Sequence, residues 1–121
     1  MKPTKMLTIA GSDVLAGGGI QADLATFNEY GYFGLSAITS IVTVTPDDFT
    51  IHPVPIAILA AQLDAIFAID DIAGVKVGLL PTVAHVELVA KSLKEYASHQ
   101  PVIIDPVMAF KETSTTNVNE L

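Results

Sequence analysis

The sequence predicts an open α/β fold in which a mostly parallel sheet carries helices on both faces. Apolar segments rich in β-branched residues alternate along the chain with segments of helical periodicity. Glycine and proline residues separate these segments, and no internal repeat or linker divides them. Strands that alternate with helices in this way favour right-handed crossovers within a single domain.

Four strands are expected, because four short runs combine apolar and β-branched residues between turn-forming residues. The third run contains Gly78, and the fourth is apolar enough that we expect it to be buried. Phe49–His52, which follows the turn Thr45–Asp48, could form a further short extended piece. The four strands are expected over Leu7–Ala10, Leu35–Val44, Val75–Leu80 and Val102–Ile104.

Three helices are expected between these strands, because their apolar residues recur at helical spacing. Pro55 suits the start of the second helix, and Thr82 is a good N-cap for the third. The polar segment Lys111–Leu121 has no periodicity and is expected to be a loop. The helices are expected over Ile20–Tyr30, Ile56–Ile69 and Val83–Ala97.

The composition excludes several classes of protein. Half of the 121 residues are hydrophobic, so a folded domain with a real core is expected. The net charge of −7, with only six Lys and Arg, argues against a nucleic-acid partner. No apolar run is long enough to span a bilayer, so we expect no membrane partner. The absence of cysteine excludes disulfides and cysteine metal ligands in this chain, and a cytoplasmic location is expected.

Four glycines lie in or near the first strand-to-helix turn, at positions 11, 17, 18 and 19. Without Cβ atoms, backbone N–H groups at such a turn can approach a small polar or anionic ligand, and the following helix adds unpaired donors. The spacing matches neither the P-loop nor the G-x-G-x-x-G dinucleotide motif. Two interpretations therefore stay open, a ligand-binding turn and a tight turn without a ligand.

In parallel sheets ligands bind beyond the carboxyl ends of the strands. Three segments are expected there, Gly11–Gly19, Thr43–Asp48 and Asp105–Lys111, and the turn after Gly78 is a fourth candidate. Asp105 directly follows an apolar strand, where a carboxylate could hold Mg²⁺ near phosphates. The alternative is ordinary turn chemistry of the Asp-Pro pair.

The remaining polar candidates have plain structural explanations. Asp23 suits the start of a helix, where the dipole favours a carboxylate, although it could also accept a hydrogen bond from a ligand. Lys111 could approach a phosphate or simply be solvated. The spacing of His52, His85 and His99 matches no metal site, so all three are expected on the surface.

Several segments together resemble the hydroxymethylpyrimidine kinase and pyridoxal kinase branch of the ribokinase-like superfamily. The resemblance runs from about residue 6 to residue 111, with its motifs in the same order and at similar separation. The matching segments are Leu7–Asp13, Gly17–Leu24 with Thr26-Phe27, Gly34–Thr39, Ala61–Leu63, Val75–Thr82, and Val102–Met108 with Lys111.

The resemblance implies a three-layer, Rossmann-type fold and ATP-dependent phosphorylation of a hydroxymethyl group. The substrate would be a small heteroaromatic alcohol, either a B6 vitamer in vitamin B6 salvage or a hydroxymethylpyrimidine in thiamin biosynthesis. ATP and Mg²⁺ are the implied cofactors, and the full-length enzyme is expected to be a homodimer.

The resemblance also implies roles for individual residues. Asp105 would lie near the phosphates and Mg²⁺, as an indirect metal contact, and Lys111 near the phosphates. No catalytic residue is expected within this chain. The positions that would bind the substrate are Gly11, Ser12, Ala16, Gly17, Gly18, Asp23, Val44, Leu80 and Val107.

Two side chains depart from the family pattern. Val44 stands where pyrimidine kinases commonly carry a glutamine, which favours a pyridoxal-type substrate because valine cannot hydrogen-bond the pyrimidine. Leu80 stands where methionine is common, a mild apolar change.

The chain is also about half as long as family members. Residues 1–121 are therefore expected to form the N-terminal, substrate-side part of one kinase domain, with the catalytic base and most of the ATP site in the other half. Such a chain would be inactive alone and would leave an apolar sheet edge open. The rival interpretation is a non-catalytic α/β module that binds a small ligand or a partner.

Overall fold

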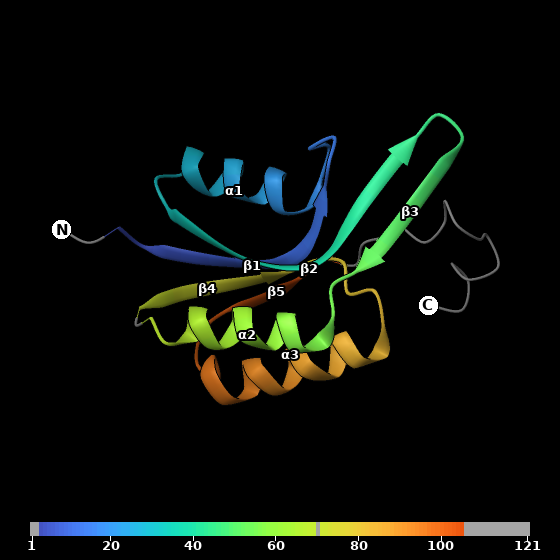
Figure 1. Ribbon diagram of the computed structural model, residues 1–121. Coiled ribbons are helices and arrows are strands. Elements are labelled where there is room, and N and C mark those ends of the chain that lie inside the picture. The colour runs from blue at the N-terminus through green and yellow to red at the C-terminus, as the bar shows by residue number, and fades with distance from the viewer. Residues whose placement is uncertain (1–2, 70, 106–121) are drawn as a thin grey trace.

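The computed structural model describes residues 3–69 and 71–105. These residues form a five-stranded sheet in the order β3-β2-β1-β4-β5, in which only the β2–β3 pair is antiparallel (Figure 1). In chain order the elements are β1 (Lys5–Asp13), α1 (Gly19–Glu29), β2 (Phe33–Thr45), β3 (Asp48–Pro53), α2 (Ile56–Phe67), β4 (Ile72–Val77), α3 (Val83–Tyr96) and β5 (Val102–Ile104).

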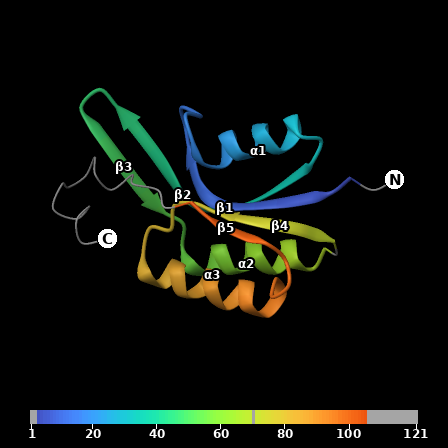
Figure 2. The same cartoon turned by 180° about the vertical axis from the view of Figure 1, so that it is seen from behind.

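Helix α1 covers one face of the sheet, and α2 and α3 cover the other (Figures 1 and 2). The core lies between the sheet and the α2–α3 layer, where Leu7, Ile9, Leu59 and Leu63 are fully buried. Burial of apolar side chains in this layer is the main favourable term in folding. The arrangement confirms the predicted open, mostly parallel α/β sheet with helices on both faces.

Strand β1 is longer than the sequence pattern suggests. It continues through Gly11, Ser12 and Asp13, which were expected in the loop. A register shift after Ala10 allows these residues to keep pairing with β2, so that Gly11 lies opposite Ser40. The glycine-rich turn therefore begins only at Val14, because tertiary pairing extends the strand beyond its apolar run.

Strands β2 and β3 form an antiparallel hairpin that projects beyond the helices as an arm (Figure 1). The extended piece expected near Phe49–His52 is a full strand at the sheet edge. Its register, with Val44 opposite Phe49, leads directly into the turn after Thr45. The turn predicted over Thr45–Asp48 is therefore confirmed as the hairpin turn at the carboxyl end of β2, where Thr43–Asp48 is expected, and this segment belongs to the arm.

Two other strands differ from expectation. Strand β4 starts at Ile72 and ends at Val77, so Gly78 follows the strand and does not lie inside it. Strand β5 has the predicted bounds but is not buried, because it lies at the edge of the described sheet. The side chains of Ile103 and Ile104 are 64% and 71% exposed.

The helices appear where they are predicted, but each ends one or two residues earlier, and α1 also begins one residue earlier, at Gly19. Thr82 is the N-cap of α3, as expected, and its hydroxyl accepts the backbone N–H of His85 at 3.3 Å. The expectation of a surface histidine is wrong for His85, which is buried. Its ring is held between Thr82 and the backbone carbonyl of Val54. His52 and His99 are exposed, as expected.

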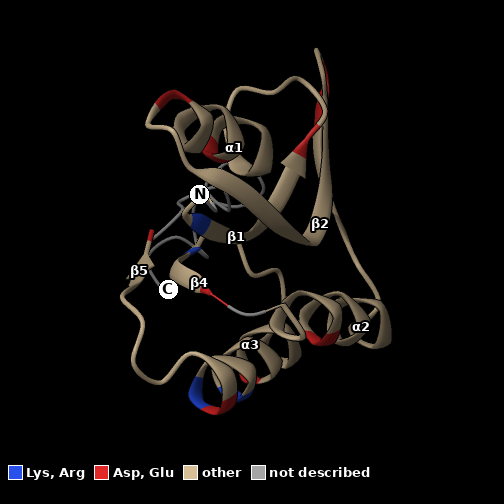
Figure 3. Ribbon diagram, turned by 90° about the vertical axis from the view of Figure 1, so that its left-hand side faces the viewer, with Lys and Arg blue, Asp and Glu red and all other residues tan. Residues whose placement is uncertain are grey.

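Charged residues are sparse along the sheet, and α3 carries both signs (Figure 3). Among the described residues, no helix is long and apolar enough to cross a membrane.

Candidate ligand-binding site

A pocket of about 160 Å³ lies beyond the carboxyl ends of β1 and β4, between the start of α1 and the base of the hairpin arm. This is where an open parallel sheet is expected to bind its ligand. Its lining is mostly apolar and glycine-rich but includes three carboxylates and one ammonium group. The lining residues are Ala10, Gly11, Asp13, Gly18, Gly19, Asp23, Val42, Phe49, Lys76, Gly78, Leu79 and Asp105.

Glycines form the side of the pocket next to α1 because the backbone approaches itself closely there. Gly19 has a φ of +65°, and a Cβ at this position would overlap the carbonyl oxygen of Gly11. A Cβ on Gly11 would lie 2.8 Å from Ser40 Oγ. Ser12 and Gly19 also form an isolated antiparallel bridge. The fold therefore requires glycine at these two positions, whether or not a ligand binds. The glycines also leave backbone exposed to the pocket.

Gln21 of α1 holds the turn in place. Its Nε2 donates to Ser12 Oγ at 2.8 Å, and its Oε1 accepts the backbone N–H of Asp13 at 3.2 Å. The Asp13 carboxylate in turn accepts the N–H of Leu15 at 2.9 Å. The hydroxyl of Ser12 is thus bonded to the helix and does not line the pocket.

Asp23 lies on the buried side of α1, with 7% of its surface exposed. Its Oδ2 accepts the hydroxyl of Thr8 at 2.7 Å, and its Oδ1 accepts the ammonium of Lys76. Thr8 and Lys76 are paired in register on β1 and β4, so their side chains point to the same face, toward α1. Asp23 is therefore more than a helix-start charge. It is a buried carboxylate with two fixed donors.

Asp105 directly follows β5, and its backbone N–H donates to the carbonyl of Val77 at 2.8 Å. Lys76 lies opposite Ile103 in the strand register, so these two side chains share a face of the sheet. Asp105 is two residues beyond Ile103 and therefore lies on the same face as Lys76. Its Oδ2 is 3.5 Å from Lys76 Nζ. With half of its side chain exposed, Asp105 can still bind a further group.

Lys76 stays charged between the two carboxylates. Burial lowers its pKa, but the hydrogen bond and the charge of Asp23, followed by those of Asp105, outweigh this effect and raise the pKa above 10.5. Among the lining residues, Lys76 is the one cation facing Asp13, Asp23 and Asp105. The pocket consequently has a net negative formal charge.

Phe49 and Val42 form the side of the pocket next to the arm. Val44 lies opposite Phe49 in the hairpin and two residues from Val42, so it shares their face one step further out. It does not line the pocket, and 37% of its surface is exposed.

Leu79 and Gly78 complete the pocket where the chain leaves β4. The carbonyl of Leu79 accepts the hydroxyl of Thr39 at 2.6 Å, which fixes this segment against β2. Leu80, which the resemblance places in the substrate site, packs against the hydrophobic core instead of lining the pocket.

Of the residues to which the resemblance gives a role, the structure brings together four in the pocket, Gly11, Gly18, Asp23 and Asp105. Five others do not line the pocket, and two lie outside the described residues. The five are Ser12, Ala16, Gly17, Val44 and Leu80, and the two are Val107 and Lys111.

Lys76 is the functional candidate that sequence reasoning missed. A single lysine within the apolar strand Ile72–Val77 is the signal that could have revealed it, because a buried charge needs a partner. Its partner, however, is 53 positions away in the sequence and became visible only in the fold.

The described residues contain no cluster of three or more His, Cys, Asp or Glu that could hold a metal ion by itself. Asp105 still fits a shared Mg²⁺ site, because Mg²⁺ is commonly held by one or two carboxylates together with substrate phosphates.

An open parallel sheet, with a glycine- and carboxylate-lined pocket at its strand ends, defines a small-molecule-binding α/β domain. The chain belongs to the phosphomethylpyrimidine kinase family, whose model matches residues 13–120. The resemblance drawn from the sequence motifs is thereby confirmed.

Relatives of both substrate types are similar to this chain. A pyridoxine kinase of Bacillus subtilis is 44% identical over 114 residues, which is 92% of this chain and 42% of the relative. A hydroxymethylpyrimidine/phosphomethylpyrimidine kinase of Haemophilus influenzae is 44% identical over 108 residues, covering 88% of this chain and 40% of the relative. The chain thus spans about two fifths of the length of these relatives.

Solved structures agree with this assignment. An ADP complex of Bacillus subtilis pyridoxal kinase matches with a TM-score of 0.83 and 43% identity, over 88% of this chain and 41% of that one. Staphylococcus aureus pyridoxal kinase in complex with AMP-PCP and pyridoxal matches with a TM-score of 0.82 and 35% identity, over 89% of this chain and 40% of that one.

Proposed function

We propose that residues 1–121 form the substrate-side part of an ATP-dependent kinase that phosphorylates the hydroxymethyl group of a small heteroaromatic ring. The observation that carries this proposal is the buried carboxylate Asp23 facing a glycine-lined pocket at the strand ends. The pocket accepts a flat ring against apolar side chains, and the carboxylate selects a ring with an N–H or O–H donor. Family membership supports the same reaction.

Asp23 is suited to orient such a ring. A carboxylate has about four acceptor sites, and Thr8 and Lys76 occupy two of them. Because Asp23 lines the pocket, its remaining capacity would be available to a ring there, and Gly11 and Gly18 would allow the ring to approach the backbone. Phe49 and Leu79 supply apolar contact on the other sides.

We further propose that the preferred ring is a B6 vitamer. Val44 lies on the pocket-facing side of the arm and offers no hydrogen bond. A pyrimidine that relies on an amide at this position would leave its own polar atoms unpaired, whereas a pyridine ring needs only apolar contact there.

Phosphoryl transfer would form a bond between the substrate hydroxyl oxygen and the γ-phosphorus of ATP and break the bond from that phosphorus to the ADP oxygen. Asp105, half exposed at the end of β5, would help to position Mg²⁺ as an indirect contact, and Mg²⁺ would neutralise phosphate charge when bound. Lys111 would approach the phosphates. The hydroxyl proton would pass to a base that we assign to the other half of the enzyme, outside residues 1–121.

The charge of the pocket supports the proposal that this chain does not turn over ATP alone. Three carboxylates and one ammonium group line it, and this balance repels the γ-phosphate. Phosphoryl transfer depends on positive groups and backbone donors around the phosphates, which another part of the enzyme would supply.

We propose a cytoplasmic homodimer for the complete enzyme. The arm formed by β2 and β3 exposes the apolar side chain of Ile41 on the face opposite Val44, and a second copy would cover that face. Light scattering after size-exclusion chromatography tests this assembly, and a monomer at micromolar concentration would contradict it.

Isothermal titration of pyridoxine and hydroxymethylpyrimidine into the 121-residue chain tests the substrate site. Pyridoxine is used because an aldehyde would react with lysine amines. We expect saturable binding of pyridoxine that an Asp23→Asn variant weakens. Binding of neither ring would overturn the substrate-pocket proposal.

Activity is tested with Mg²⁺, ATP and pyridoxine, first with the chain alone and then with the chain joined to the C-terminal part of the Bacillus subtilis pyridoxine kinase. We expect product only from the joined protein. Turnover by the 121-residue chain alone would contradict the division of the site.

A non-catalytic small-ligand module is the second candidate, favoured by the negative pocket. It predicts ring binding without turnover in either form of the protein.

A further inference from the structure

The proposed reaction gives no role to Lys76, although this residue lies in the pocket beside two of the carboxylates. Its ammonium contacts Asp23, which lines the proposed ring site, and lies 3.5 Å from Asp105, beside the proposed phosphate site. With 29% of its side chain exposed, Lys76 is partly enclosed by this contact network, and Asp23 is almost fully enclosed. The two carboxylates come from α1 and from the end of β5, so Lys76 is the group that joins them.

The sheet register explains why a lysine on β4 can do this. Lys76 lies opposite Thr8 on β1 and opposite Ile103 on β5. It therefore points to the same face as Thr8 and Asp105, and α1 covers that face with Asp23. An ammonium group has three donors, enough to bind both carboxylates at once.

We propose that Lys76 is a positioning residue of this kinase, whose ammonium group couples the ring-facing carboxylate of Asp23 to the strand-end carboxylate of Asp105. This inference rests on the proposed function, because it assigns Lys76 a part in the same reaction. Lys76 donates to the Asp23 carboxylate and fixes the direction of its free acceptor site. It also holds Asp105 at the edge of the pocket.

Electrostatics make the coupling specific. Without Lys76, the carboxylates of Asp13, Asp23 and Asp105 would line the pocket together, and none of the described lining residues would carry a positive charge. A buried carboxylate that loses a cationic partner turns toward water or toward another donor. In either case Asp23 would no longer present a fixed acceptor to the ring. The loss would therefore appear in ring binding and not only in stability.

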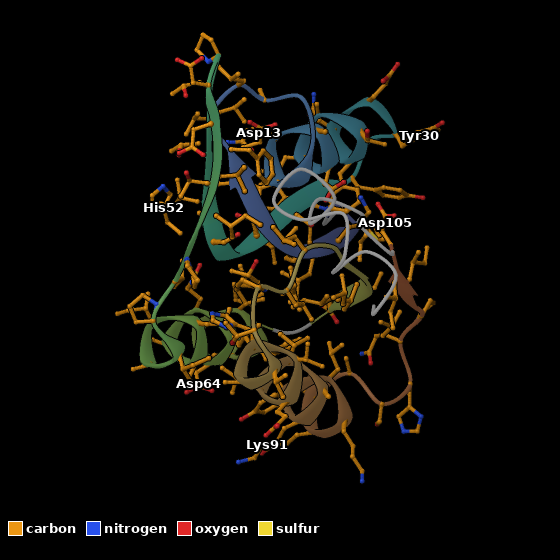
Figure 4. The ribbon with its side chains drawn as sticks, turned by 90° about the vertical axis from the view of Figure 1, so that its right-hand side faces the viewer. Asp13, Tyr30, His52, Asp64, Lys91 and Asp105 are labelled. Carbon is orange, nitrogen blue, oxygen red and sulfur yellow. The ribbon has the colours of Figure 1, made fainter. Side chains whose placement is uncertain are left out.

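The first test needs no ligand. The side-chain ¹³C resonances of Asp23 and Asp105 are recorded at pH 7 in the wild-type chain, in Lys76→Met and in Lys91→Met. Lys91 is the matched control because it extends from α3 away from the sheet, far from Asp105 (Figure 4). We expect both carboxylate resonances to move in Lys76→Met and neither in Lys91→Met. If only one of the two resonances moves in Lys76→Met, the proposed coupling of Asp23 to Asp105 is wrong.

If Lys76→Met fails to fold, the double variant Asp23→Asn/Lys76→Met removes both buried charges together. The resonance of Asp105 is then compared between this variant and Asp23→Asn alone. We expect it to move when Lys76 is replaced, and an unchanged resonance would overturn the proposal.

The second test is a double-mutant cycle on pyridoxine affinity with the same variants. We expect Lys76→Met to weaken binding about tenfold in the wild-type background and less than about twofold in the Asp23→Asn background. Equal losses in both backgrounds would mean that Lys76 contacts the ring directly, and the positioning role would be wrong. If the wild-type chain binds no pyridoxine, the proposed function fails, and the resonance test decides the coupling independently.

Discussion

Gly19 lies directly against Gly11, so that a Cβ on Gly19 would overlap the carbonyl oxygen of Gly11. The contact joins the start of α1 to the end of β1 and shapes one side of the pocket. Because Gly19 also has a φ of +65°, two separate effects disfavour any other residue there.

The substitution Gly19→Ala is expected to lower the free energy of unfolding by more than about 2 kcal/mol, since it adds a backbone clash to the strain of a left-handed residue. Gly31→Ala separates the two effects, because Gly31 has a φ of +80° but open space around it. It should cost about 1 kcal/mol. Urea unfolding measures both, and equal costs would show that the contact with Gly11 is unimportant.

The substitution Val44→Gln is expected to raise the affinity for hydroxymethylpyrimidine about fivefold, because one new hydrogen bond is worth about 1 kcal/mol. Stability should change by less than about 0.5 kcal/mol at this partly exposed position. Titration calorimetry measures the affinity. Ile41→Gln, on the opposite face of the same strand, is the control, and no gain over that control would contradict the specificity argument.

Replacement of His85 by alanine is expected to destabilise the protein by about 1–3 kcal/mol, because it leaves buried polar groups unpaired. His85 Nε2 donates to the carbonyl of Val54 at 2.7 Å, and its Nδ1 lies 2.6 Å from Thr82 Oγ1. Thermal or urea unfolding measures the loss. His99→Ala, at an exposed position, should have almost no effect, and similar values for both variants would refute a structural role of His85.

The ion pair of Lys76 predicts a pH dependence of stability at alkaline pH. The folded state raises the pKa of Lys76 above 10.5, so it holds this proton more tightly than the unfolded chain does. The stabilisation is therefore complete below pH 10.5 and is lost as the pH rises through the higher pKa of the folded state.

The measurement compares unfolding of the wild-type chain and of Lys76→Met between pH 9 and pH 12. Tyr96 titrates in the same range, because the charge of Glu95 raises its pKa, but it does so in both proteins. The difference between the two curves should therefore shrink with rising pH. A constant difference would show that the ammonium charge of Lys76 contributes nothing.

Much of the fold could be predicted from local pattern. The alternation of strands and helices, the capping of α3 by Thr82 and the short span of β5 all follow from residues that are close in the sequence. Spacing and turn chemistry carry this information because hydrogen bonds within helices and turns join near neighbours. The family motifs likewise pointed to Gly11, Asp23 and Asp105.

The errors concern relationships between distant segments. Strand β1 runs on to Asp13 because β2 offers partners, and β3 forms because it pairs with β2. His85 is buried because the chain before α2 passes over it, and β5 is exposed because it lies at the edge of the described sheet. No local pattern contains these facts.

The sequence by itself determined the α/β class, the order of its elements and the glycines that the first turn requires. Only the tertiary structure decided that Lys76 joins Asp23 to Asp105. The physical reason is that periodicity reports which face a residue occupies, whereas the partner on that face depends on strand register and helix packing.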